Sequence, residues 1–410
     1  MTRVPTVQQN SILDQPRAVW ALAFAAVIAF MGIGLIGPIL PTVTVQLGAT
    51  PTQTSLLFTS YLAITGLGMF FTSWVSSRIG YRTTLMLGLA VIVVASALAG
   101  CATSIEALIA FRALWGLGNA LFISTALASI ISAANGSAGS AIIIYEAALG
   151  LGIAMGPLAG GLLGTIGWQA PFFGTAVLML IAFGSILFFL PRSGSRPEHA
   201  SVGAPFRALA VPSILTLAVA AFLYNIGFFV LMSYTPYPLG FTSLGIGMVF
   251  TGWGLGVALT SVFGAPMLTR RISPRRVLWA MLALFAAALA VTGLEVGNTP
   301  ALVAMVVVGG LIIGVINTVL TECVMEASDL PRAVASSSYS GVRFLGGAIA
   351  PPVAAALAAA WTPTVPFLFG AGGVLLAAVL VLAAGRVLER TEEPFHESPA
   401  QEAEAISLGE

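Results

Sequence analysis

The chain has 410 residues, of which 58% are hydrophobic and only 8% are charged. An ordinary soluble domain carries about 25% charged residues, so a water-soluble globule of this size could not cover so much apolar surface. The formal net charge is +1, and no basic patch lies outside the apolar segments, so nucleic acid is excluded as a partner. The remaining solvent is a lipid bilayer, in which a spanning helix needs about 20 mostly apolar residues.

The chain begins with a polar stretch, 1–17, that lacks the pattern of a cleavable signal peptide. Apolar segments bounded by Gly, Pro, Ser or Arg clusters follow, and together they predict an all-α membrane protein with 12 transmembrane helices. The predicted segments are 18–40, 54–76, 83–103, 107–131, 140–163, 168–190, 211–233, 244–268, 277–294, 301–323, 336–360 and 365–385.

The longest polar interruption before the C-terminal tail is 191–210, which contains the run PRSGSRPEH. We interpret it as a linker between two halves of the protein. The predicted division is an N-terminal six-helix bundle at 1–190, a cytoplasmic linker at 191–210, a C-terminal six-helix bundle at 211–388 and an acidic cytoplasmic tail at 389–410.

The arginines predict the orientation. All 16 basic residues are arginine, and only Arg112 and Arg343 fall inside apolar segments. The other arginines lie on the side that carries both termini, and none lies in a loop on the opposite side. Because cytoplasmic loops carry the excess of basic residues, we expect both termini in the cytoplasm.

The two halves also repeat. Tyr145 to Pro157 aligns with Tyr339 to Pro351 at an offset of 194 residues, with matching tyrosine, glycine and proline positions. The loop RIGYR at 78–82 aligns with RISPR at 271–275 at an offset of 193 residues. Two landmarks with nearly one offset indicate internal duplication, with the transport path between the halves.

The fifth segment carries the most specific motif, GIAMGPLAGG, in which glycines recur at intervals of four. Such spacing leaves one helix face without side chains, so that a neighbouring helix can approach closely, and the proline permits a bend. Ordinary small-residue packing is the alternative explanation. The fixed positions are Gly152, Gly156, Pro157, Gly160 and Gly161.

This motif resembles the antiporter motif GxxxGPxxGG of the twelve-helix drug:proton antiporters of the major facilitator superfamily. The resemblance covers essentially the whole chain and implies the major facilitator fold, in two pseudo-symmetric six-helix halves. It also implies a bacterial inner-membrane exporter of drugs, toxic compounds or siderophore-like metabolites, coupled to protons and working by alternating access. A monomer without cofactors is expected.

The fourth segment places Arg112 before Gly116 and Gly118, which is similar to the family's RxxxGxG element, associated with proton coupling. A guanidinium inside hydrocarbon costs about 2.5–3.5 kcal/mol by insertion scales, so it should face a cavity and have a partner. The alternative is that Arg112 reaches the outer interface, since Glu106 lies only a few residues away.

The loop between the second and third segments is similar to the family's gating motif at Arg78, Gly80 and Arg82. Ser73 replaces the motif's first glycine, and Ser77 replaces its acid. In the family that acid belongs to a contact that latches the outward-closed state. We therefore expect a weaker or different latch in this chain.

Glu146 is the best candidate for proton coupling, because burial raises the pKa of a carboxyl group toward neutral pH. Arg112 and Arg343 are its candidate partners, and Tyr339 with Arg343 resembles a stretch found in bacterial drug and siderophore exporters. A fixed structural pair of Glu146 with Arg343 is the alternative.

Substrate contacts are expected from uncharged side chains, because a mostly apolar cavity suits amphipathic compounds. No GxxxxGK[ST] stretch and no metal-ligand spacing occur, so neither ATP-driven pumping, a metal site nor an enzyme is predicted. A proton-coupled importer or facilitator of a small nutrient remains the alternative function. The candidate cavity residues are Phe30, Trp115, Asn119, Tyr145, Tyr224, Asn225, Phe228, Tyr234, Trp253, Asn317 and Tyr339.

Overall fold

The computed structural model describes residues 15–135, 138–191, 201–327, 330, 332–385 and 387–388. Within these ranges all regular secondary structure is helical, and 12 helices are long and apolar enough to cross a membrane. The predicted all-α fold with twelve spans is confirmed. The expected acidic tail and most of the expected linker lie outside the described residues.

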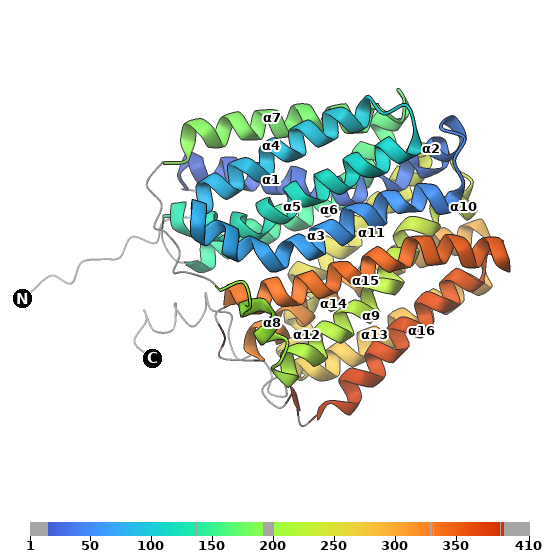
Figure 1. The fold of residues 1–410 in the computed structure, drawn as a ribbon. Coiled ribbons are helices and arrows are strands. Elements are labelled where there is room, and N and C mark those ends of the chain that lie inside the picture. The colour runs from blue at the N-terminus through green and yellow to red at the C-terminus, as the bar shows by residue number, and fades with distance from the viewer. Residues whose placement is uncertain are drawn as a thin grey trace, which may run out of the picture.

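The N-terminal half contains six spans, drawn in blue to green in Figure 1. The first span consists of three elements, because α1 passes through the 3₁₀ turn η1 into α2. Its elements are α1 (Arg17–Gly34), η1 (Gly37–Ile39), α2 (Leu40–Gln46), α3 (Pro51–Ile79), α4 (Tyr81–Gly100), α5 (Ile105–Ala133), α6 (Ala138–Gly164) and α7 (Ala170–Phe189).

The C-terminal half repeats this order after a short helix in the linker, α8 (Ala204–Ala208). The second span of this half, the eighth of the chain, is interrupted by a π-helical turn, η2, which the sequence did not predict. The elements are α9 (Pro212–Tyr234), α10 (Pro236–Leu239), α11 (Ser243–Leu259), η2 (Thr260–Gly264), α12 (Ala265–Thr269), α13 (Pro274–Leu294), α14 (Thr299–Glu326), α15 (Arg332–Ala360) and α16 (Val365–Ala383).

The spans alternate in direction, so the turns gather on two sides. We call the side with the turns at Gly80 and 271–273 the basic side, and the side with the turns at 48–50 and 240–242 the opposite side. On the opposite side, side-chain caps satisfy the first turn of four helices. The capping residues are Thr50 for α3, Ser104 for α5, Thr242 for α11 and Asn298 for α14.

Equivalent contacts in the two halves match the predicted repeat. Arg82, in the first turn of α4, donates a hydrogen bond of 3.1 Å to the carbonyl of Leu187 near the end of α7. Arg275, in the first turn of α13, donates one of 3.3 Å to the carbonyl of Leu382 near the end of α16. The aligned basic loops therefore perform the same task, which is to join the third and sixth spans of each half.

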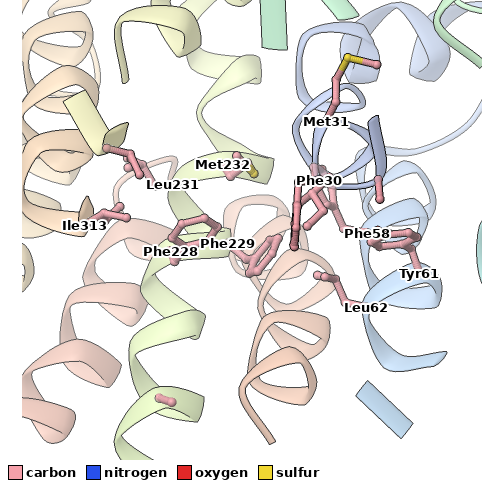
Figure 2. Packing of buried hydrophobic residues seen from close by; sticks show 14 of the residues in the cluster. Phe30, Met31, Phe58, Tyr61, Leu62, Phe228, Phe229, Leu231, Met232 and Ile313 are labelled. Atoms are coloured by element: carbon pink, nitrogen blue, oxygen red, sulfur yellow. The ribbon is translucent and has the colours of Figure 1, made fainter. Parts of the chain in front are cut away.

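The halves meet along two helix pairs, α3 with α15 and α6 with α11. The Thr59 hydroxyl on α3 donates a hydrogen bond of 2.6 Å to the carbonyl of Ala348 on α15. Phe58 on α3 meets Phe229 on α9 edge to face, with ring centroids 6.0 Å apart (Figure 2). An apolar groove lies beside this interface, between α3, α9 and α15, and Leu345 is among the residues that line it.

The linker is more than a polar connection, because α8 contacts both halves. Phe206 stacks on Phe70 of α3, with centroids 5.1 Å apart and planes 12° apart. The Ser338 hydroxyl on α15 donates a hydrogen bond of 2.9 Å to the carbonyl of Pro205. The helix forms because Pro205 and Ala208 bury an apolar side against the bundle, a signal too short to stand out in the sequence.

Candidate functional site

The N-terminal half holds a fully buried cation. Arg112 on α5 is 0% exposed, and its Nε donates to the carbonyl of Leu57 on α3 at 3.3 Å. Its Nη1 donates to the carbonyl of Gly32 on α1 at 3.5 Å. The guanidinium thus lies among three helices, so Arg112 does not extend to the interface beside the exposed Glu106.

Two aromatic rings enclose this guanidinium. Its central carbon lies 4.2 Å from the ring centroid of Tyr61 and 4.8 Å from that of Trp115. Asn119, one turn beyond Trp115, donates to the Tyr61 hydroxyl. Arg112 Nη2, Trp115 Nε1 and Asn119 Oδ1 are buried without a hydrogen-bond partner among the described residues. The ring faces favour the charge, since desolvated cation–π contacts contribute about 2 kcal/mol.

We expect Arg112→Lys to lower the free energy of unfolding by about 2 kcal/mol. A compact ammonium cannot bond both carbonyls and also stack on two rings. Thermal unfolding of the purified protein in detergent would measure the change. Arg276→Lys is the matched control, because Arg276 is exposed. Equal stability of Arg112→Lys and wild type would contradict this role for the guanidinium.

The C-terminal half contains a second arginine, in a different environment. Arg343 on α15 is partly exposed, and its Nη2 donates to Oδ1 of Asn317 on α14 at 2.9 Å. The same oxygen accepts a hydrogen bond from the Tyr224 hydroxyl on α9 at 3.1 Å. The three residues connect α9, α14 and α15, although the sequence assigned Arg343 to proton coupling and the other two to substrate contact.

Glu146 lies on α6, but its side chain is outside the described residues. Its neighbour Tyr145 meets Phe30 edge to face, with ring centroids 5.9 Å apart. No acidic side chain in the described part of the chain is bonded to Arg112 or Arg343. The proposed pairing of Glu146 with either arginine therefore stays a prediction.

The glycine motif on α6 serves two contacts rather than one. The three glycines spaced by four face α1 within the same half, where a Cβ on any of them would collide with a carbonyl oxygen. The fourth, Gly161, faces α11 of the other half, where a Cβ would lie 2.9 Å from the Cα of Gly247. The glycines facing α1 pair Gly152 with Val27, Gly156 with Met31 and Gly160 with Leu35.

The halves are also joined by neutral hydrogen bonds on the opposite side. The hydroxyls of Thr42 and Ser243 lie 3.2 Å apart, and those of Thr44 and Tyr237 lie 3.3 Å apart. Together with Gly161 against α11, they close this side of the interface. Sequence reasoning missed these residues, because a threonine or serine at a helix end carries no distinctive signal.

The loop at 78–82 stays within its own half. Arg78 lies over the ring of Trp74 at 5.5 Å, and Gly80 has a positive φ of 85° that favours glycine. The Ser77 hydroxyl, where the family has an acid, donates to the carbonyl of Trp74 at 2.8 Å. Ser77 therefore bonds within its own helix.

Most predicted cavity residues are packed. Phe228 contacts Tyr224 and Trp253, with centroid distances of 6.1 Å and 5.7 Å. Tyr234 packs on Phe367 at 5.5 Å. Among the eleven predicted residues only Asn317 is partly exposed; the others are buried. Their contact with substrate stays a prediction. Tyr61, a polar ring inside the second span, is buried like them, although the sequence did not single it out.

Comparisons with known proteins agree with this architecture. Multidrug efflux protein YfmO of Bacillus subtilis is 49% identical over 379 residues, which cover 92% of this chain and 96% of that protein. A chloramphenicol resistance protein of Streptomyces lividans is 27% identical over 385 residues, covering 89% and 94%.

The fold is also found in a solved structure. The crystal structure of the human organic anion transporter MFSD10 superposes with a TM-score of 0.68 at 19% identity, covering 89% of this chain and 99% of that one. The family model described as Major Facilitator Superfamily matches twice, at residues 22–238 and 217–409. The chain therefore belongs to the major facilitator superfamily and is a multi-pass membrane protein.

Proposed function

We propose that this protein exports small amphipathic molecules, such as drugs, across the bacterial inner membrane in exchange for protons. The observation that carries the proposal is the 49% identity to a protein named for multidrug efflux, which extends over 96% of that relative. The mainly apolar side chains between the helices support the proposal, because such surroundings suit lipophilic compounds.

Alternating access is the proposed mechanism, with the halves at 1–190 and 211–388 moving against each other around a central site. The neutral contacts on the opposite side support it, because each hydrogen bond contributes only about 1 kcal/mol and can break and re-form. The basic side faces the cytoplasm, as the arginine distribution indicates. The protein works as a monomer, and each half contributes one intramembrane arginine.

Glu146 is the proposed proton carrier. It lies on α6 next to Tyr145 and one helical turn and a half before the glycine motif, on the helix that contacts both α1 and α11. A carboxyl group placed there can take up a proton in one conformation and release it in the other. Movement of the halves would change its distance from Arg112 and Arg343, and so its proton affinity.

We expect Glu146→Gln to abolish efflux that depends on the proton gradient. Glutamine keeps the size of the side chain but cannot carry a proton. The measurement is efflux of a panel of lipophilic dyes from cells and uptake into inverted vesicles, each with and without a protonophore. Glu106→Gln is the matched control, since Glu106 is an exposed residue in the first turn of α5.

The outcomes separate the candidate functions. Protonophore-sensitive accumulation in inverted vesicles, lost in Glu146→Gln and kept in Glu106→Gln, supports the proposal. Accumulation in whole cells would instead indicate an importer. Flux that ignores both the protonophore and the substitution would indicate a facilitator, and would leave Glu146 a structural charge.

A further inference from the structure

The two intramembrane arginines differ in how their donors are used. Arg112 is enclosed, with two nitrogens bonded to carbonyls and the third sealed inside the protein. Among the residues that the structure describes, Arg343 makes one hydrogen bond, to Asn317. Its Nε and Nη1 make no hydrogen bond among the described residues, and neither is sealed from solvent. A guanidinium has five N–H donors, so Arg343 keeps most of its donors available.

Arg343 faces the interior rather than the lipid. Leu345, two residues along α15, lines the apolar groove between α3, α9 and α15 together with Ile349, which is 46% exposed, so this side of α15 faces outward. Successive helix residues are about 100° apart, so Arg343 lies about 160° around the helix from Leu345. Its exposure is therefore toward the space between helices, on the side of α15 that bonds α14 through Asn317.

A second donor lies one turn before Arg343. Tyr339 is 2% exposed, and its hydroxyl is buried without a hydrogen-bond partner among the described residues. Residues four apart share a helix face, and Tyr224 donates to the same Asn317 oxygen that accepts from Arg343. A buried phenol without a partner costs free energy. An acceptor that reached this hydroxyl would recover that cost.

The surroundings of these donors are aromatic. Tyr224 meets Phe228 and Phe285 edge to face, at 6.1 Å and 6.0 Å, and Phe228 meets Trp253 at 5.7 Å. Among the described residues a neutral amide, and no carboxylate, bonds Arg343, so this contact positions the cation without neutralising it. Open guanidinium donors beside aromatic rings suit a ligand with an anionic oxygen at one end and an apolar body.

We propose that Arg343 and Tyr339 form a subsite for the carboxylate of an amphipathic organic acid. The guanidinium fork binds the carboxylate oxygens, the Tyr339 hydroxyl donates to one of them, and the rings around Tyr224 contact the apolar body. The subsite rests on the proposed function, because it places acidic amphiphiles among the exported compounds. It gives Arg343 a role in substrate binding beside its proposed effect on the proton affinity of Glu146.

The test is equilibrium binding to the purified protein in a nonionic detergent. The probes are 1-pyrenebutyrate and its neutral amide, which differ only at the terminal group, and fluorescence anisotropy reports both. The wild type is expected to prefer the carboxylate. Arg343→Gln should weaken carboxylate binding about tenfold to a hundredfold and leave amide binding nearly unchanged. Arg343→Lys should recover part of the loss, because it keeps the charge without the fork.

Tyr339→Phe should weaken carboxylate binding about threefold to tenfold, as expected for one neutral donor. Arg276→Gln is the control for removal of an arginine, since its side chain is exposed. Equal affinity of the wild type for the two probes would overturn the proposal, as would an equal loss of both probes in Arg343→Gln. Binding of the amide also verifies that each variant is folded.

This outcome can be told apart from failure of the proposed function. Protonophore-sensitive dye efflux together with no carboxylate preference would refute the subsite alone. Carboxylate preference that depends on Arg343, in a protein that shows no proton-driven efflux, would support the subsite and refute proton-coupled export.

Discussion

Gly160→Leu is expected to abolish recovery of folded protein. A Cβ at Gly160 would collide with the backbone carbonyl of Leu35, which follows the end of α1, so a leucine side chain would force α1 and α6 apart. Overpacking of this kind costs about 3 kcal/mol when backbone atoms cannot move aside. The measurement is the yield of monodisperse protein by size-exclusion chromatography, followed by its thermal unfolding midpoint.

The control for this substitution lies on the same helix. A Cβ at Gly150 would meet no heavy atom within 4 Å, so Gly150→Leu adds the same side chain to α6 without a collision. It should be recovered at nearly the wild-type yield. Normal yield and stability of Gly160→Leu would contradict the close packing of α6 on α1.

The sequence was sufficient to predict the helices and the repeat. The twelve apolar segments can be identified without knowing which helices they pack against, because length and composition alone indicate a membrane span. The aligned basic loops were equally informative, since Arg82 and Arg275 make equivalent contacts with the sixth span of each half.

The partners of those helices were harder to predict. The spacing of Gly152, Gly156 and Gly160 indicated a helix face that a neighbouring helix could approach closely, but it did not identify that neighbour. This face packs on α1 within one half, and among the four motif glycines Gly161 faces α11. A helix turns about 100° per residue, so two adjacent residues can face two different neighbouring helices. Periodicity shows which residues share a face, but it cannot identify the helix that packs on that face.

The chemical state of each charge was also beyond the sequence. Arg112 and Arg343 are alike as single arginines inside apolar segments, yet one is enclosed by Tyr61 and Trp115 while the other keeps open donors. The difference comes from side chains on other helices. Neutral contacts such as Thr42 with Ser243 are even less predictable. Serine and threonine are common in membrane helices, and their hydroxyls often bond only the backbone of their own helix.

Gly161→Leu is expected to reduce transport strongly while leaving each half folded. Gly161 faces α11, where a Cβ would lie 2.7 Å from the carbonyl oxygen of Ser243. A leucine would hold the halves apart on the opposite side and shift the equilibrium away from the closed arrangement about tenfold to a hundredfold. If alternating access requires this closure, dye efflux should fall by a similar factor.

A disulfide between Thr42→Cys and Ser243→Cys would report the closure directly, because the two native hydroxyls lie only 3.2 Å apart. The native Cys101 and Cys323 would first be replaced by serine and alanine. Cross-linking should be efficient in this background and reduced by Gly161→Leu. Gly372→Leu should have no effect, because a Cβ there meets nothing within 4 Å. Undiminished cross-linking and efflux in Gly161→Leu would show that the halves close without this glycine contact.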